Sequence, residues 1–307
     1  MASNIQTKKV FFGMGTVNSI TVFEDAEEAL SAAKDRVKEL DCKLSAYAHD
    51  SEICNINKNA GISPVKVSKD TFRIIKHSVM YSEFTDGYFD ITSRPLSQLW
   101  KQAMKCGENP DSMQISQAKE LIDYKNIIFD NENRTIMLRK KDQQLDLGAI
   151  AKGYAADEVR KLLLSYGVRN AVINFGGTII NIGPARKIGL QKPFASNGKT
   201  YASIKITDGK SVVTSGIYEQ FRIIDNNLIH HITDIRTGYP ANSGLIAVTL
   251  IGNNAEELDA LATSAFIIGA DNSLKLLKIR NIDAIFITDK QEIYATKKIK
   301  NEIIAAK

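Results

Sequence analysis

Apolar residues recur every three or four positions along several stretches of the sequence. After Asp25 this spacing predicts a long amphipathic helix, for which Asp25 and Glu28 are placed as an N-terminal capping pair. Its apolar stripe consists of Ala26, Leu30, Ala33, Val37, Leu40 and Leu44. The same spacing predicts helices at 69–83, 96–103, 116–121, 255–268 and 273–278, and one that ends at Tyr166 before Gly167.

Short apolar runs that end at glycine or polar turns predict strands. They lie at 9–23 (interrupted at Gly13), 171–175, 187–190, 203–206, 211–214, 221–224 and 245–251, with hairpins around 131–133 and 284–295. Residues 45–67 are predicted to be a polar loop. Because strands and helices intermix without steady βαβ alternation, the sequence predicts an α+β fold with a mixed, largely antiparallel sheet core and packed helices. The 307 residues can form a single domain or two closely joined halves.

The composition of the chain mainly excludes certain functions and sites. A net charge of +5, from dispersed basic residues, is too mild to indicate nucleic-acid binding, although it favours an anionic ligand slightly. Cys42, Cys54 and Cys106 are odd in number and lack CxxC spacing, so neither a disulfide framework nor a zinc site is predicted. No stretch reaches the roughly 18 apolar residues of a membrane span. Residues 1–10 contain no apolar stretch, so we expect a cytoplasmic chain or the mature form of an exported one.

Asp259 and Thr263 lie one turn apart on one face of the predicted 255–268 helix. Their neighbours are small and apolar, and a carboxylate in such company is costly unless it is paired or binds a metal. On spacing alone, an Asp259 at the edge of the apolar stripe that reaches water or a lysine is the commoner case. The functional alternative is a hard cation with oxygen ligands, such as Mg²⁺.

A second candidate is the segment 145–154, where Asp146 and Lys152 flank a strand-to-helix turn that contains glycine. Free backbone groups at such a turn can hold phosphate or lend a carbonyl to a metal, and a capped helix start is the simpler explanation. The spacing differs from GxxxxGK[ST], so it does not indicate a P-loop. On a strand, His230 and His231 would point to opposite faces, so one of them can serve as a general base in a given site.

Aromatic residues near turns provide the remaining candidates. Tyr47 follows the first predicted helix, and Tyr88, Phe89 and Asp90 follow Gly87. Such side chains can stack on a planar ring, and more often they cap a core.

Taken in order, these motifs resemble the FAD:protein FMN transferase family, also described as ApbE-like proteins. The resemblance runs from Met14 to about Gly269. The alanine, acid and proline common in the family are replaced here by Leu258, Thr178 and Ile235, and none of these departures removes a metal ligand. The landmarks are Met14-Gly15-Thr16, Ser45-x-Tyr47 with Ser51-Glu52-Ile53 and Asn57, and the segments 86–92, 145–153, 174–177, 214–218, 231–238 and 259–263.

The resemblance implies an ApbE-like fold and a set of ligand contacts. In the family, Mg²⁺ is held by positions that match Asp259, Thr263 and the main-chain carbonyl of Ala149, and Ala262 is expected to contribute through its backbone. The flavin nucleotide is expected to contact Met14, Tyr47, Tyr88, Phe89, Asp90, Asp146, Lys152 and Thr233.

The resemblance also implies a reaction in which FAD is the substrate. A Thr or Ser hydroxyl of an acceptor protein attacks the FMN phosphorus and AMP leaves, with Lys152 as a catalytic positive charge and His231, or failing it His230, as the base. Family acceptors are subunits of membrane redox pumps or flavin-bearing reductases. Two alternatives stay open: a Mg²⁺-dependent FAD pyrophosphatase that gives FMN and AMP, and a non-catalytic flavin-binding protein, although simple flavin storage requires no cation site.

Overall fold

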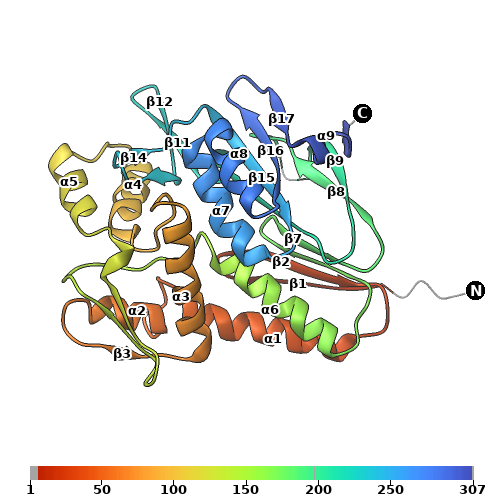
Figure 1. The fold of residues 1–307 in the computed structure, drawn as a ribbon, viewed down its shortest axis with the longest axis horizontal. Coiled ribbons are helices and arrows are strands. Elements are labelled where there is room, and N and C mark those ends of the chain that lie inside the picture. The colour runs from red at the N-terminus through yellow and green to blue at the C-terminus, as the bar shows by residue number, and fades with distance from the viewer. Residues whose placement is uncertain (1–5, 197, 306–307) are drawn as a thin grey trace, which may run out of the picture.

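The computed structural model describes residues 6–196 and 198–305, and its largest element is an eight-stranded sheet (Figure 1). Every neighbouring pair in this sheet is antiparallel. In spatial order the strands are β1 (Thr7–Gly13), β2 (Thr16–Val22), β6 (Ala171–Phe175), β7 (Thr178–Ile182), β10 (Ser211–Gly216), β15 (Leu245–Gly252), β16 (Asp283–Thr288) and β17 (Ile293–Ala295). The predicted α+β class with a largely antiparallel core is therefore confirmed.

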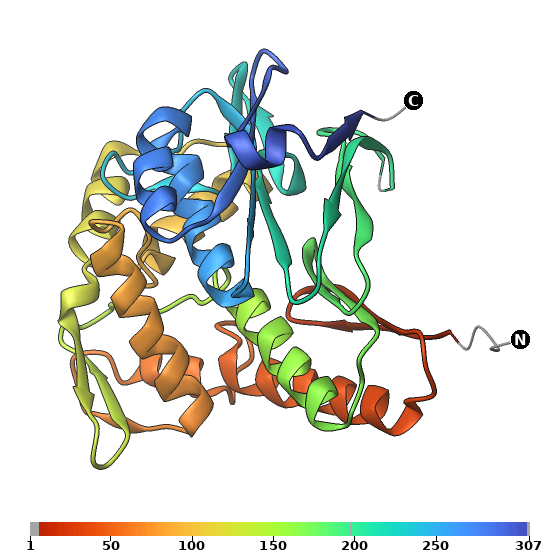
Figure 2. The ribbon, with the colours of Figure 1, turned by 45° about the vertical axis from the view of Figure 1, so that its right-hand side comes forward.

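Most helices gather on one side of this sheet, and the green strands β8 (Arg186–Gln191) and β9 (Thr200–Ile206) lie on the other (Figure 2). The alternation of side chains along β10 explains the layers, because Val213 packs with the core of α7 (Ala255–Ile268) whereas Val212 packs against β8 and β9. The helices are α1 (Glu27–Leu44), α2 (Glu52–Lys58), α3 (Lys69–Phe84), α4 (Arg94–Cys106), α5 (Ser112–Glu120), α6 (Ala151–Ser165), α7 (Ala255–Ile268), α8 (Ala270–Ile279) and α9 (Lys297–Lys300).

Smaller sheets surround this arrangement. One has the order β3 (Val65–Lys66), β5 (Thr135–Leu138), β4 (Ile127–Asp130), and another has the order β18 (Ile303–Ala305), β9 (Thr200–Ile206), β8 (Arg186–Gln191). Two-stranded pairs are formed by β11 (Phe221–Ile224) with β12 (Asn227–His230), and by β13 (Thr233–Asp234) with β14 (Tyr239–Pro240). Among the described residues, no helix has both the length and the apolar character needed to span a bilayer.

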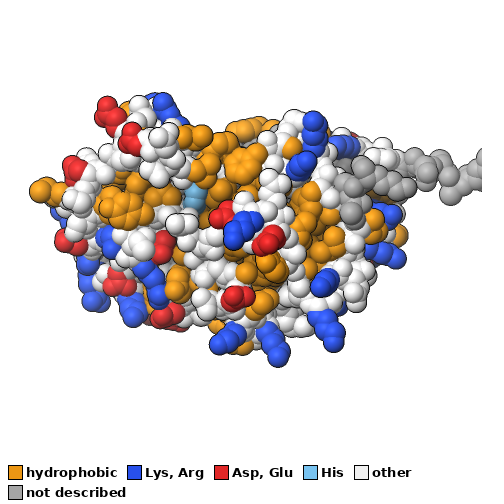
Figure 3. All heavy atoms as spheres, turned by 90° about the horizontal axis from the view of Figure 1, so that it is seen from above, with side chains coloured by type: hydrophobic (Ala, Val, Ile, Leu, Met, Phe, Trp, Pro, Cys, Tyr) orange, Lys and Arg blue, Asp and Glu red, His pale blue; other side chains and the backbone are white. Residues whose placement is uncertain are grey.

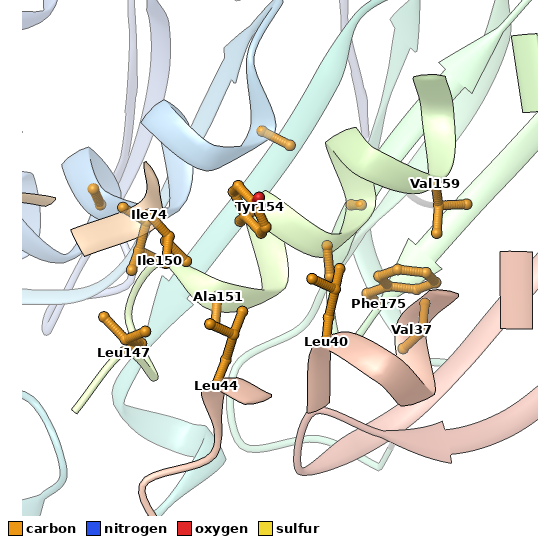
Figure 4. Packing of buried hydrophobic residues seen from close by; sticks show 14 of the residues in the cluster. Val37, Leu40, Leu44, Ile74, Leu147, Ile150, Ala151, Tyr154, Val159 and Phe175 are labelled. Carbon is orange, nitrogen blue, oxygen red and sulfur yellow. The ribbon is translucent and has the colours of Figure 1, made fainter. Parts of the chain in front are cut away.

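The turn that precedes α6 is anchored in the main core. Leu147 and Ile150 are almost completely buried, and Figure 4 shows them beside Ile74 of α3 and the side chains that join α1 to α6. Tyr154 and Phe175 are among the largest fully buried side chains in this cluster. Because the apolar residues of the turn are fixed, the intervening Gly148 and Ala149 present their backbone at a defined place.

Two local predictions are wrong. Helix α1 begins after Ala26 without a side-chain cap, so Asp25 and Glu28 do not form the expected pair, although the buried stripe from Leu30 to Leu44 is as predicted. The segment predicted as a polar loop contains α2, which Ser51 caps by accepting a hydrogen bond from the backbone N–H of Cys54. At seven residues, α2 is too short for its apolar periodicity to stand out.

Candidate functional site

A cleft of about 1110 Å³ brings most of the sequence-predicted residues together. Its walls come from the β1–β2 turn, the turn before α6, the ends of β6 and β10, one face of α7 and the segment after β12. A volume of this size accommodates a large cofactor. The predicted residues that line it are Met14, Tyr47, Tyr88, Phe89, Asp90, Asp146, Ala149, Lys152, His231, Thr233, Asp259 and Thr263.

The carboxylate of Asp259 lies at the point where α6 meets α7. Its Oδ2 accepts a hydrogen bond from the backbone N–H of Gly153 at 3.0 Å, and its Oδ1 lies 3.7 Å from Lys152 Nζ. Asp259 is only 3% exposed, so Coulomb interactions with its neighbours are weakly screened by water. The N–H belongs to the first turn of α6, where the helix dipole also favours a negative charge.

Close packing of α6 against α7 creates this arrangement. A Cβ placed on Gly153 would lie 2.2 Å from the carbonyl oxygen of Ala255, so the helices can approach this closely only at a glycine. Asp157 adds a second link, because its Oδ2 accepts from the backbone N–H of Glu256 at 3.0 Å. Burial raises the pKa of Asp157 to about 6. The two helices are thus joined by two hydrogen bonds, in each of which a backbone N–H of one helix donates to a carboxylate of the other.

Oxygen atoms suited to a hard cation lie along the same wall. Thr263, one turn after Asp259 on α7, and Ala149 both line the cleft. Ala262 does not: it is fully buried in mid-helix and is not among the residues of the cleft wall. Within residues 6–196 and 198–305, no group of three His, Cys, Asp or Glu side chains could hold a metal. A cation here would therefore depend on one carboxylate with hydroxyl and carbonyl oxygens, which Mg²⁺ accepts when substrate or water completes the shell.

Asp146 is the centre of the outer wall of the cleft. Its Oδ2 accepts from the Tyr47 hydroxyl at 3.2 Å and from Arg94 at 3.4 Å, and its Oδ1 accepts from the backbone N–H of Gly148 at 2.9 Å. Two cations lie near the Tyr47 ring, with the Arg94 guanidinium carbon 4.5 Å and Lys101 Nζ 5.0 Å from its centroid. Tyr47 is 62% exposed, so this ring is presented to a ligand rather than packed into the core.

In the turn at residues 88–90, the aromatic and acidic side chains have different roles. Tyr88 faces the cleft, its ring lies 3.8 Å from the Arg236 guanidinium carbon, and its hydroxyl accepts from Arg236 at 2.7 Å. Asp90 also lines the cleft, but its carboxylate accepts from the backbone N–H and hydroxyl of Thr92 and from the backbone N–H of Tyr124. Burial raises the pKa of Asp90 to about 6. This carboxylate is therefore committed to holding the turn.

Met14 and Thr233 lie on two further segments of the wall. Met14 occupies the left-handed region at φ 53°, in the tight β1–β2 turn. The Thr233 hydroxyl oxygen is buried and has no hydrogen-bond partner among the described residues. An unsatisfied buried hydroxyl costs about 1–3 kcal/mol, a cost that a polar ligand atom in the cleft would offset.

The two histidines are in different environments. His230 is 3% exposed and packs edge-on against Phe266; its Nε2 meets the Ala241 carbonyl at 3.0 Å and its Nδ1 accepts from the Ile232 backbone N–H. His231 lines the cleft, and its Nδ1 lies 3.3 Å from the Gln220 carbonyl. A carbonyl only accepts, so this Nδ1 carries the proton and Nε2 is left as a proton acceptor. Burial lowers the pKa of His231 to about 4.

Three charged residues of the site were missed from sequence. Arg94 and Lys101 come from α4, whose pattern shows only an amphipathic helix. Glu219 lines the cleft, and its pKa is raised chiefly by burial and also by Asp259, while Lys152 opposes the shift. It follows directly after the 214–218 motif, so extending that motif by one position would have included it.

The comparisons with known proteins agree on one family. The ApbE family model matches residues 14–286. An FAD:protein FMN transferase of Klebsiella pneumoniae is 34% identical over 281 residues, which are 91% of this chain and 88% of the relative, and one of Treponema pallidum is 27% identical over 94% of this chain and 86% of the relative. The crystal structure of the ApbE protein of Thermotoga maritima superposes with a TM-score of 0.86 at 30% identity, over 97% of this chain and 99% of that one.

Proposed function

Since this chain belongs to the ApbE family, we propose that it is a flavin transferase that moves FMN from FAD to a Thr or Ser hydroxyl of an acceptor protein in a Mg²⁺-dependent reaction. One observation carries the proposal: the cleft brings a buried carboxylate and further oxygen donors, a lysine and a neutral histidine to one place. Phosphoryl transfer requires positioning and charge neutralisation more than covalent catalysis, and these groups supply both.

His231 acts on the attacking hydroxyl. Its Nε2 accepts the hydroxyl proton while the Nδ1–H is held by the Gln220 carbonyl. The hydroxyl oxygen forms a bond to the FMN phosphorus, the bond from that phosphorus to the bridging pyrophosphate oxygen breaks, and AMP leaves with the bond electrons. A hydroxyl with a pKa far above 7 is a weak nucleophile, so a positioned base accelerates this step. The role proposed for His230 as an alternative base has no support, because both of its ring nitrogens are occupied.

Asp259, Thr263 and the Ala149 carbonyl would hold Mg²⁺. When bound, the ion supplies positive charge beside the pyrophosphate oxygens and the leaving AMP. Lys152 places its ammonium at the same end of the cleft, where it adds charge and offsets that of Asp259. Ala262 is left out of the proposed ligand set because it is fully buried and does not line the cleft.

The flavin nucleotide would occupy the rest of the cleft. Tyr47 and Tyr88 offer ring faces to the isoalloxazine, and each is held by an arginine. The Thr233 hydroxyl is available for a hydrogen bond to the nucleotide. Asp146 positions Tyr47, and Met14 and Phe89 contribute to the adjoining walls. The acceptor is proposed to be a redox-pump subunit or a flavin-dependent reductase.

Acceptor-dependent labelling tests the function. The protein is incubated with FAD, Mg²⁺ and candidate acceptors of these two classes, and covalent flavin is followed by in-gel fluorescence. Mass spectrometry then locates the modified residue, and chromatography measures AMP. We expect one AMP released per flavin attached, a phosphoester to Thr or Ser, and no labelling when EDTA replaces Mg²⁺.

The rival functions give different products. A pyrophosphatase would release FMN and AMP at the same rate whether or not an acceptor is present. A flavin-binding protein would leave FAD intact. Labelling that persists in EDTA would contradict the proposed metal dependence while leaving the transferase function in place.

A further inference from the structure

One face of the β11–β12 hairpin is anchored to the helices α4 and α5. Within the described part of the chain, these two strands pair only with each other. Arg222 donates to the carbonyl oxygens of Met104 and Lys105 at the end of α4, each at 2.8 Å. Ile224 and Ile229 are buried against apolar residues of α4 and α5. The hairpin is therefore firmly held from this side.

The other face of the hairpin is apolar and exposed, except at its base, where His230 is buried. Phe221 and Ile223 are two positions apart on β11, so their side chains share a face, and Leu228 lies directly opposite Ile223 on β12. Their exposed fractions are 43%, 65% and 38%. Contiguous exposed apolar residues are typical of interaction sites.

A residue from a distant loop extends this apolar face. Phe194 is 50% exposed, and its ring lies 5.2 Å from that of Phe221 in a near-perpendicular arrangement. Its backbone occupies the left-handed region at φ 56°, which is unfavourable by about 1–2 kcal/mol for a residue with a Cβ. The chain thus carries strain at the position that brings this ring to the mouth of the cleft.

The exposed face leads directly into the site. Phe194 and Phe221 line the cleft together with His231. The carbonyl that orients His231 belongs to Gln220, the residue before Phe221. Figure 3, seen from above, shows hydrophobic side chains gathered next to histidine atoms on this surface. A segment lying on the hairpin would therefore have its neighbouring residues within reach of the proton acceptor.

We propose that Phe194, Phe221, Ile223 and Leu228 form the docking surface for the acceptor protein and bind apolar side chains that flank the modified hydroxyl. This inference rests on the proposed transfer to a protein hydroxyl. A macromolecular acceptor has to contact the rim of the cleft, and this apolar surface is continuous with the cleft on the side of the proposed base.

The test changes residues that lie outside the cleft. The variants are Ile223→Asp and Ile223→Val, and the control is Ile279→Asp on α8, where the native side chain is 74% exposed. The probe is the acceptor protein that the wild-type enzyme flavinylates in the assay above. For Ile223→Asp we expect the KM for the acceptor to rise about tenfold, with kcat and the Kd for FAD within about twofold of the wild type. Ile223→Val and Ile279→Asp should behave like the wild type.

Thermal melts and light scattering accompany the kinetics. An unchanged acceptor KM in a folded Ile223→Asp variant would overturn the docking proposal. So would a change from oligomer to monomer without a change in KM, because this face would then join copies of the chain. If the wild type labels no protein at all, the proposed function itself fails and the docking proposal falls with it.

Discussion

The α6–α7 junction and the outer aromatic wall are built by different means, although both face the same cleft. At the junction, Asp259 is 3% exposed and is held by the backbone N–H of Gly153. On the wall, Tyr47 is 62% exposed and is held by side-chain cations, including Arg94 at 4.5 Å from the ring centroid. One region depends on the spacing of two helices, and the other depends on solvated side chains.

This difference determines how each region responds to change. A charge at the junction is poorly screened and has few alternative partners, so a small displacement alters the field at the reacting phosphate. On the wall, water and neighbouring cations can replace a lost contact, and exposed polar contacts are weak. We therefore expect single substitutions at the junction to have large effects, and substitutions on the wall to have small ones.

The largest effect is expected for Asp259→Ala. Loss of the carboxylate removes the proposed cation site and several kcal/mol of charge stabilisation, so kcat/KM for FMN transfer should fall by about a thousandfold. Discontinuous assays of AMP release measure the rate of transfer, and calorimetry measures the affinity for Mg²⁺. Asp50→Ala removes a side chain that is 97% exposed and should leave both quantities unchanged. Full activity in Asp259→Ala would rule out the proposed metal site.

Gly153→Ala tests the helix contact itself. Alanine is the better helix former by about 1 kcal/mol, so on propensity alone this change would stabilise the protein. We expect the reverse, a loss of about 3 kcal/mol in the free energy of unfolding, because the new Cβ would meet the Ala255 carbonyl oxygen at 2.2 Å. Urea denaturation measures the change. Gly13→Ala, where the nearest atoms are 3.4 Å away, should cost much less.

The sequence predicted those parts of the site that depend on local periodicity. Asp259 and Thr263 were placed one turn apart because a helix fixes the direction of residues four apart. The glycine turn before α6 was found for the same reason, since a glycine turn next to an apolar pattern is a local feature, but the strand predicted before it is absent because residues 145–147 pair with no strand among the residues that the structure describes. The motif resemblance added the ligand roles that the spacing left open.

What the sequence could not show is how distant segments meet. The hydrogen bond from Gly153 to Asp259 joins residues 106 positions apart, and Lys101 reaches Tyr47 across 54. Alternation along a strand predicted that only one of the paired histidines could face a given site, but not which one. That choice depends on the core around Phe266, which encloses His230 and leaves His231 in the cleft.

His231→Gln should have a smaller effect than Asp259→Ala, because it removes general-base assistance but leaves the charges at the junction. We expect a fall in kcat of about a hundredfold. With the pKa of His231 lowered to about 4 by burial, Nε2 is deprotonated above that pH. Titration of His231 should therefore not change the wild-type kcat/KM between pH 5.5 and 8. Protonation of His231 should lower kcat/KM only as the pH falls toward 4. A fall in kcat/KM with an apparent pKa near 6.5 that is absent in His231→Gln would contradict this protonation state.

The smallest effects are expected at Tyr47. Tyr47→Phe keeps the ring beside Arg94 and Lys101 and removes only the exposed hydrogen bonds that the hydroxyl makes with Asp146 and Lys101, so the Kd for FAD should rise less than about fivefold. Tyr47→Ala also removes the stacking surface and should raise that Kd about tenfold, with kcat little changed. Flavin fluorescence titration measures both. If Tyr47→Ala reduced turnover as much as Asp259→Ala, the aromatic wall would be part of the catalytic centre. The two regions would then not differ in their sensitivity to substitution, as we infer that they do.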